Sequence, residues 1–263
     1  MSTYVLSDVH GQYNAYKKIL EKIHFSDKDF LYVLGDVIDR GPEGIRLIRD
    51  IMQRENAELL LGNHECMLLN ALEFLRQREA GELDDEVYDG FTPYELWVHP
   101  CNGGEGTCLE LLSMPEEERK EIEEYLRSLY LIRRIKVGET SYHLSHSYSL
   151  KKRFGKSIKY AGTPPKQVEE IVWESMFDKR GLADDYERPW AYIRDIYVMG
   201  HIFTQRLGEL DESGRGCIYE KEDFQGYHVI DVDCGMALNS RSSQLGCLCL
   251  DTGERYYVPL LED

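Results

Sequence analysis

Thr3-Tyr4-Val5-Leu6-Ser7-Asp8-Val9-His10-Gly11 opens the chain with an apolar run that ends abruptly in polar residues. The β-branched and apolar residues 3–7 are typical of a buried strand, and residues 8–11 read as a loop. Apolar residues then recur at the three- and four-residue spacing of an amphipathic helix: Tyr13, Tyr16, Ile19, Leu20 and Ile23. The stretch therefore predicts a unit of strand, polar loop and helix.

The same unit recurs twice further along the chain. Residues 30–34 read as a strand, 35–41 as a loop and 42–54 as a helix with proline in its first turn. Residues 59–61 lead into Gly62-Asn63-His64-Glu65 and a third helical stripe. Strands linked by helical crossovers run parallel, so their carboxyl ends meet at one edge of the sheet, where ligands usually bind. The polar side chains expected at that edge are Asp8, His10, Asp36, Asp39, Asn63 and His64.

The rest of the chain has a different pattern. The acidic stretch 81–95 predicts a loop or lid, residues 101–104 predict a tight turn, and Ser113-Met114-Pro115-Glu116 has the spacing of a capping box before a helix. Short apolar runs bounded by turns predict strands at 131–137, 141–144, 196–199, 227–232, 246–250 and 255–258. Residues 251–254 predict a hairpin between the last two strands, so we expect a largely antiparallel C-terminal half. We expect one α/β domain, residues 1–263, with a variable insertion at about 149–195.

Charge and composition exclude several classes of protein. The formal net charge of −17 argues against a nucleic-acid partner, because affinity for nucleic acid comes largely from Lys and Arg. No window approaches the roughly 18 apolar residues that a membrane helix needs, so we expect a cytoplasmic protein without a membrane partner. The seven cysteines are odd in number and form no Cys-x-x-Cys pair, which predicts reduced thiols. The oligomeric state is left open.

Several of the polar residues suit a metal centre. Asp8 and His10 lie two apart at a strand end and can turn toward one ion, while Asp36 ends the next strand and can bridge two ions. Asn63 offers an amide oxygen, and His146 and His201 each follow an apolar run and complete the ligand set. Carboxylate and imidazole ligands suit manganese, iron or zinc better than calcium. Two such ions suit phosphoryl chemistry, because they clamp phosphate oxygens and offset negative charge.

Three further residues suit the transfer itself. His64 can protonate the leaving group, Asp39 can orient that imidazole, and Arg40 presents a planar fork of donors for a phosphate. Each residue alone has an ordinary structural explanation, since aspartate before glycine often forms turns and a lone histidine is usually structural. The combination of all of them is what predicts a catalytic site.

The three blocks also resemble known sequences. Residues 7–11, 35–41 and 62–65 resemble, in order and spacing, the three signature blocks of the phosphoprotein phosphatase family of calcineurin-like metallophosphoesterases, its bacterial and phage-type members in particular. Ser7 replaces the usual first glycine, as in bacteriophage-type members. The segments His143-Leu144-Ser145-His146-Ser147 and Gly200-His201 resemble those that supply the family's last two metal histidines.

The resemblance implies a sandwich of two mixed β-sheets flanked by helices, with two divalent metal ions, Mn²⁺ above Fe or Zn. Asp8, His10 and Asp36 would hold one metal, and Asp36, Asn63, His146 and His201 the other. Arg40, Asn63 and His64 would contact the phosphate. A hydroxide bridging the metals would attack directly, with His64 and Asp39 as the catalytic residues and no phosphoenzyme.

Two details are open at this stage. His143 is the alternative to His146, because strand alternation prevents both from facing one side; we choose His146, where the apolar run ends. Phage-type members carry an arginine shortly after a tryptophan in the insertion, but here Trp173-Glu174-Ser175 has none. The arginines that could replace it from the same insertion are Arg180, Arg188 and Arg194. The turn Asn102-Gly103-Gly104 resembles one near the active site of such members.

These observations predict a metal-dependent phosphomonoesterase, a protein phosphatase acting on Ser, Thr and also Tyr residues. The alternative within the same chemistry is a hydrolase of diadenosine polyphosphates or other nucleotides. A third hypothesis, from another class, is a catalytically silent binding module, for which the missing insertion arginine is the support.

Overall fold

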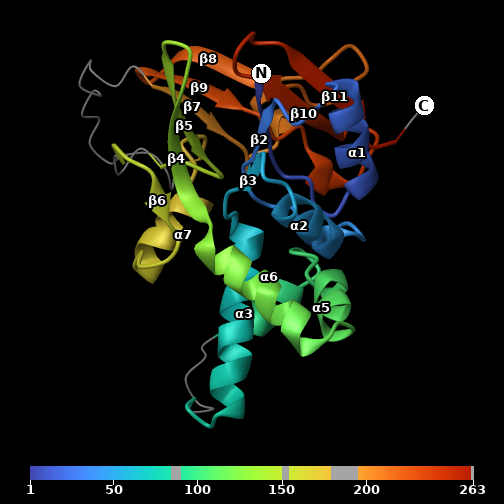
Figure 1. Cartoon of the computed structure of the whole chain (residues 1–263), viewed down its shortest axis with the longest axis vertical. Helices are drawn as coiled ribbons and strands as arrows, with labels where there is room; N and C mark the ends of the chain where they lie inside the picture. Colours follow the sequence, from blue (N-terminus) through green and yellow to red (C-terminus); the bar gives the residue numbers. More distant parts are fainter. Residues whose placement is uncertain (84–89, 150–153, 179–194, 262–263) are drawn as a thin grey trace.

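The computed structural model describes residues 1–83, 90–149, 154–178 and 195–261 of the chain. Two β-sheets lie in its upper part, with helices beside them and below them (Figure 1). The first sheet has the order β11-β10-β1-β2-β3 and the second the order β6-β4-β5-β7-β9-β8. The strands are β1 (Thr3–Leu6), β2 (Phe30–Val33), β3 (Ala57–Leu59), β4 (Tyr130–Val137), β5 (Thr140–Ser145), β6 (Ile158–Lys159), β7 (Ile196–Met199), β8 (Tyr219–Phe224), β9 (Tyr227–Asp231), β10 (Gln244–Cys249) and β11 (Arg255–Pro259). The helices are α1 (Tyr13–Lys22), α2 (Gly44–Met52), α3 (Asn63–Glu79), α4 (Pro93–Val98), α5 (Glu105–Leu112), α6 (Glu116–Ser128) and α7 (Pro165–Trp173), with short 3-10 turns at Thr204–Leu207 and Met236–Leu238.

The predicted strand-loop-helix units are confirmed. β1 pairs with β2 and β2 with β3, both in parallel, with α1 and α2 as the crossovers. Alternate residues of β1 face opposite sides: Leu6 packs in the core cluster that includes Ile19 of α1 and Ile48 of α2, and Val5 packs toward the second sheet. The carboxyl ends of these three strands therefore meet at one edge, as the sequence predicts.

The space between the two sheets is filled by apolar side chains from both. Val5 and Tyr32 of the first sheet share one buried cluster with Leu144, Val198 and Ile230 of the second. This interior fixes how the two sheets lie against each other, because close-packed side chains leave little freedom to slide. The fold is thus the expected α/β sandwich of two mixed sheets flanked by helices.

The expectation of a largely antiparallel C-terminal half holds for most strand pairs but misses the parallel centre of the second sheet. β5, β7 and β9 pair in parallel and form the centre of the second sheet, although β4, β8, β10 and β11 do pair antiparallel with their neighbours. Parallel neighbours need a long connection, and the segments after β5 and β7 are long enough. The hairpin at residues 251–254 is correct, but it describes only the pair β10 and β11.

Two local predictions between α3 and β4 also need correction. The stretch 81–95 is not entirely a loop, because Thr92 caps α4 by accepting a hydrogen bond from the Glu95 backbone; residues 84–89 lie outside the described part. The capping box at Ser113 is absent: α6 begins after Pro115, and the Ser113 hydroxyl bonds to the Glu110 carbonyl instead. Proline fixes φ, and it starts this helix without a side-chain cap.

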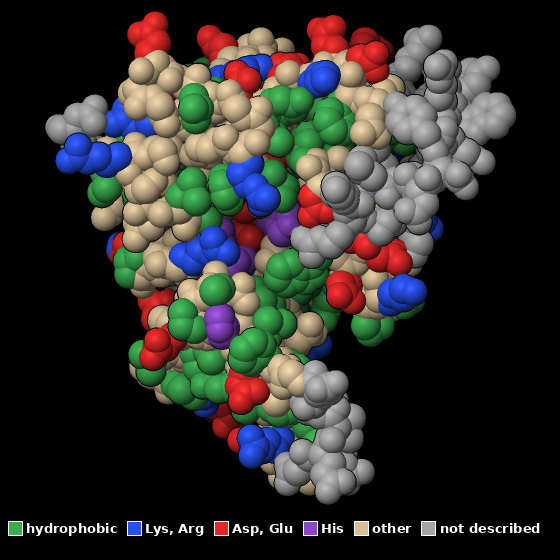
Figure 2. Space-filling model, turned by 180° about the vertical axis from the view of Figure 1, so that it is seen from behind, with side chains coloured by type: hydrophobic (Ala, Val, Ile, Leu, Met, Phe, Trp, Pro, Cys, Tyr) green, Lys and Arg blue, Asp and Glu red, His purple; other side chains and the backbone are tan. Residues whose placement is uncertain are grey.

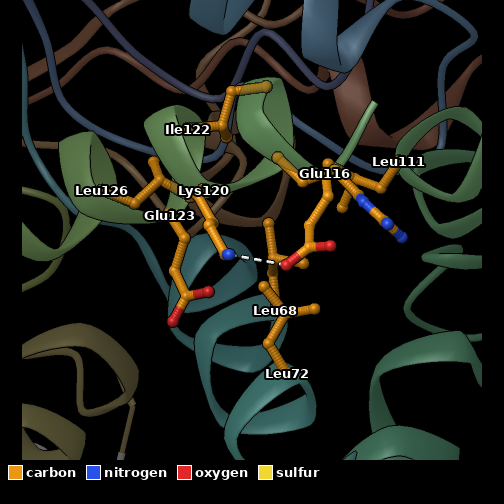
Figure 3. A pocket seen from close by; sticks show the side chains of 9 residues that line it. Leu68, Leu72, Leu111, Glu116, Lys120, Ile122, Glu123 and Leu126 are labelled. Atoms are coloured by element: carbon orange, nitrogen blue, oxygen red, sulfur yellow. Dashed lines mark ion pairs between the residues drawn. The ribbon is translucent and has the colours of Figure 1, made fainter. Parts of the chain in front are cut away.

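Helices α3, α5 and α6 form a layer below the sheets (Figure 1). Figure 3 shows Leu68 and Leu72 of α3 facing α6, with the Lys120 ammonium 2.5 Å from the Glu116 carboxylate at the edge of the contact. Both charged side chains are exposed, so the pair adds little stability beyond the apolar contact. Within the described residues, no helix combines the length and the apolar character that crossing a membrane requires.

Candidate metal centre

The predicted polar residues converge at one edge of the sandwich. Those of the first sheet follow β1, β2 and β3, and the two histidines of the second sheet follow β5 and β7. Arg40 is exposed and His201 is partly exposed. The other predicted site residues are buried: Asp8, His10, Asp36, Asp39, Asn63, His64 and His146. Figure 2 shows histidines at the bottom of a hollow, with Lys or Arg side chains beside it. The structure thus assembles residues that are distant in sequence into one site.

Asp36 lies at the middle of this site. Two groups of potential metal ligands share it: one with His10 and His64, the other with His146 and His201. Its Oδ2 atom is 3.8 Å from Nε2 of His10 and 3.5 Å from Nε2 of His146. Asp8 extends the first group, since its Oδ1 is 3.9 Å from the same atom of His10. Asp36 therefore lies within reach of both groups, and its bridging role stays a prediction.

The orientation of two imidazoles fits metal binding. The Nδ1 atom of His10 is 3.0 Å from the Ile38 carbonyl and that of His146 is 2.9 Å from the Leu34 carbonyl. A carbonyl only accepts, so each Nδ1 carries the proton and each Nε2 presents a lone pair toward the carboxylates. Backbone carbonyls that fix a histidine in this way are common partners of metal-ligating imidazoles.

Asn63 gives the second test of fit. Its Oδ1 is 2.8 Å from Nε2 of His146 and 3.0 Å from Nδ1 of His201, and these two nitrogens are 3.1 Å apart. Because Nε2 of His146 and an amide oxygen are both acceptors, their close approach is unfavourable without a positive charge between them. A divalent cation supplies that charge, so the donor set fits a metal ion.

Burial shifts the pKa values of the carboxylates and the imidazoles of the site in opposite directions. It raises the pKa of Asp36 well above its usual range, and the nearby carboxylates of Asp8 and Glu65 raise it further. Burial lowers the pKa of His10 well below its usual range, assisted by His64 and Arg40. A bound cation would oppose the first effect, because it stabilises the ionised form of a carboxylate that holds it.

The backbone of the site is conformationally unusual. Among the described residues, nine other than glycine have positive φ, and six of them belong to the site: Asp8, His10, Asp36, Asp39, Arg40 and His201. Such conformations cost roughly 1 kcal/mol or more each and persist only where surrounding contacts hold them. Because these strained residues are concentrated in the loops after the strands, they support the prediction that these loops form a functional site.

Glu65 is one such contact, and sequence reasoning missed its role. Its fully buried carboxylate accepts hydrogen bonds from the backbone N–H groups of Asp36 (2.9 Å), Val37 (2.9 Å) and Gly62 (3.0 Å). It therefore ties the loop after β2 to the start of α3. Gly62 is needed beside it, because a Cβ there would overlap the Asp36 carboxylate. The sequence signal that could have indicated this role is the position of Glu65 as the third residue of α3, where a glutamate often accepts a hydrogen bond from the backbone at the start of the helix.

We predict that Glu65→Gln lowers the free energy of unfolding by about 2 to 4 kcal/mol, because a buried amide group would face backbone N–H donors. Chemical denaturation followed by circular dichroism measures the change. Glu79→Gln, an exposed position in the same helix, is the control and should unfold as wild type does. Equal stability of the two variants would show that the Glu65 carboxylate does not hold the loops.

His64 and Asp39 form a buried pair beside the potential metal ligands. The Nδ1 atom of His64 is 2.7 Å from Oδ2 of Asp39, so its Nε2 faces the site, 3.8 Å from Oδ2 of Asp36. The Trp97 indole donates to both Asp39 oxygens, at 3.2 and 3.0 Å, and the Asp39 backbone N–H donates to the Thr107 hydroxyl. No local sequence signal links Trp97 and Thr107 to the site, since α4 and α5 bring them from a distance.

The protonation of this pair follows from burial. Burial raises the pKa of Asp39 to about 7, against hydrogen bonds from Thr107 and Trp97 that lower it. Burial also lowers the pKa of His64 well below its usual range, and Arg40 adds to this effect. Burial therefore favours the neutral form of each group, whereas a phosphate near Nε2 would favour the imidazolium.

The remaining sequence predictions have mixed outcomes. An Arg40 guanidinium nitrogen lies 3.3 Å from Nε2 of His64, and the Arg40 backbone N–H donates to the Gly103 carbonyl, so the turn at 101–104 does lie beside the site.

His143 is on the other face of β5, packed against Tyr148 and Tyr197. The structure therefore places His146 in the cluster, as chosen. The three candidate clamp arginines lie outside the described residues: Arg180, Arg188 and Arg194.

Sequence comparisons point to one family. Residues 1–202 match the pattern of the calcineurin-like phosphoesterases. A symmetrical bis(5'-nucleosyl)-tetraphosphatase of Buchnera aphidicola subsp. Schizaphis graminum is 31% identical over 123 residues, which are 45% of this chain and 42% of that relative. One from Delftia acidovorans is 37% identical over 91 residues, 34% of this chain and 32% of the relative. The chain thus spans less than half the length of these curated relatives.

Solved structures share the fold over nearly the whole chain. One whose description proposes a diadenosine tetraphosphatase has a TM-score of 0.58 at 17% identity and covers 99% of this chain and 94% of its own. A cold-active protein tyrosine phosphatase has a TM-score of 0.54 at 19% identity, with 97% and 78% covered. A Saccharomyces cerevisiae protein serine/threonine phosphatase has 0.54 at 14%, with 100% and 81% covered. At these identities the likeness shows the fold alone.

Proposed function

Because this chain belongs to the calcineurin-like phosphoesterase family, and is on that ground a metal-dependent phosphoesterase, we propose that it hydrolyses dinucleoside tetraphosphates symmetrically, to two nucleoside diphosphates. Two divalent cations, Mn²⁺ in the first place, are proposed to bind at Asp36 and the ligands around it. The observation that most supports a two-metal site is that two groups of potential ligands share the Asp36 carboxylate.

The choice of substrate rests on the curated relatives. Symmetrical tetraphosphatases match this chain at 31 to 41% identity, whereas the protein phosphatases are similar at the level of fold. This reverses the order in which the two substrates are expected from the sequence, where the protein phosphatase comes first. The acidic chain offers no general attraction to long polyanions, which agrees with a small, metal-neutralised phosphate substrate.

The site residues have separate proposed roles. The bound cations would supply charge neutralisation and activation of the attacking water. Arg40 would bind a phosphate oxygen that lies beyond the metals, since its guanidinium is exposed at the mouth of the site. His64 would hold a proton at Nε2 for the departing oxygen, and Asp39 would keep that ring in place through Nδ1.

A substrate panel tests the proposal. With Mn²⁺ added, we expect diadenosine tetraphosphate to be hydrolysed to ADP at least about tenfold faster, as kcat/KM, than a phosphoserine peptide, and a chelator to remove both activities. Chromatography of the nucleotides identifies the products. Formation of AMP and ATP would contradict symmetrical cleavage, and a preference for the peptide would contradict the choice of substrate.

A protein phosphatase is the second candidate. It is favoured by the His64–Asp39 pair at 2.7 Å, because an alkoxide leaving from a phosphoserine needs a proton more than a departing nucleoside diphosphate does. The panel separates these two functions, and the His64 variant described below provides an independent measure.

A further inference from the structure

A cavity of about 370 Å³ lies between α3 and α7, next to the metal centre. Cys66, Met67 and Asn70 of α3 form one wall, and Val168 and Trp173 of α7 form the other. Its size is in the range of small-molecule sites, roughly 300 to 1,000 Å³. None of the proposed catalytic steps uses this α3–α7 cavity, so its role is unassigned.

The α3–α7 cavity is connected to the metal centre through both walls. On α3, Asn63, Cys66, Met67 and Asn70 follow the i, i+3, i+4, i+7 spacing, so the ligand and the cavity wall share one face of the helix. At a rise of about 1.5 Å per residue, this face runs roughly 10 Å from Asn63 to Asn70. On α7, the Trp173 ring stands edge-on to His201, with ring centroids 6.2 Å apart.

The side chains around the cavity suit an uncharged heteroaromatic ring. Trp173 and Tyr160 provide aromatic surface, and Met67 and Val168 provide apolar contact. Asn70, exposed at the rim, can both donate and accept hydrogen bonds, as the edge of a purine does. Among the described residues that line the cavity there is no Lys or Arg, and Glu169 adds a carboxylate, so these residues offer nothing to hold a phosphate there.

We propose that the α3–α7 cavity is the subsite for one purine base of the substrate. The base packs against Trp173, and its phosphate chain extends along α3 to the metal ligands. This inference rests on the proposed function, because a dinucleoside tetraphosphate is the substrate that carries a base at this reach from the reacting phosphate. A phosphoserine peptide has no such ring.

Filling the cavity tests the inference. Asn70→Trp places a large ring at the rim, and Thr163→Trp does so from the loop before α7. We expect either variant to raise the KM for diadenosine tetraphosphate roughly tenfold relative to the KM for p-nitrophenyl phosphate, which has no base, as loss of base stacking would. Arg78→Trp, exposed on α3 beyond the cavity, is the matched control and should leave the ratio of KM values at its wild-type level.

The outcomes distinguish the subsite from the proposed function. If wild type hydrolyses diadenosine tetraphosphate and both cavity variants keep the wild-type ratio of KM values, the subsite is wrong and the function stands. If both substrates are affected equally, the residues act on the fold or the metal centre, and the subsite is again wrong. If wild type hydrolyses p-nitrophenyl phosphate but no tetraphosphate, the proposed function fails and the subsite fails with it.

Discussion

Asp36→Asn is expected to lose bound metal and hydrolytic activity together, with turnover falling by a factor on the order of a thousand or more. The carboxylate lies between the two groups of potential ligands, 3.8 Å from Nε2 of His10 and 3.5 Å from Nε2 of His146. Asparagine keeps the size of the side chain but removes the charge that two cations would share. The loss should therefore affect both ions, unlike the loss of a ligand at one end.

Metal content per chain and turnover of p-nitrophenyl phosphate measure this effect on the same samples. Circular dichroism checks that the variant is folded, which matters because Oδ1 of Asp36 also accepts from the His64 backbone N–H at 3.0 Å. Asp223→Asn, an exposed aspartate of the β8–β9 hairpin, is the control and should retain metal and activity. A folded Asp36→Asn that keeps two metals per chain would refute the bridging role.

His64→Asn should keep the metal content near two per chain and lower turnover by an amount that depends on the leaving group. For a phosphoserine peptide we expect a loss of about 10² to 10⁴, the usual contribution of a general acid. For diadenosine tetraphosphate we expect a loss of roughly tenfold, because a nucleoside diphosphate is a better leaving group and needs less proton transfer. The geometry behind this prediction is Nδ1 of His64 at 2.7 Å from Asp39, which directs Nε2 to the site.

The control for this variant is His228→Asn, a partly buried histidine that pairs with Glu220 at 2.7 Å in the second sheet. It should behave as wild type with both substrates. Equal losses on the peptide and the tetraphosphate would mean that His64 acts by binding phosphate rather than by donating a proton. Unchanged turnover on both would remove His64 from the catalytic residues.

The sequence alone predicts the first sheet and most of the candidate site. Each signal is local: the apolar run of β1, the helical spacing of α1 and the polar residues directly after each strand all lie close together in the sequence. Parallel pairing then follows from the helical crossovers, and with it the meeting of Asp8, Asp36 and Asn63. The placement of His146 rather than His143 follows from the end of its apolar run.

Contacts between distant segments were decided only by the tertiary structure. Trp97 reaches Asp39 from 58 residues away in the chain. β7 inserts in parallel between β5 and β9, which the expectation of a largely antiparallel half did not include. Hydrophobic periodicity fixes which face of an element is buried but not which partner covers it. That choice depends on close packing across the whole core, so the sequence determined the chemistry of the strand ends, and the fold determined which distant residues hold and surround them.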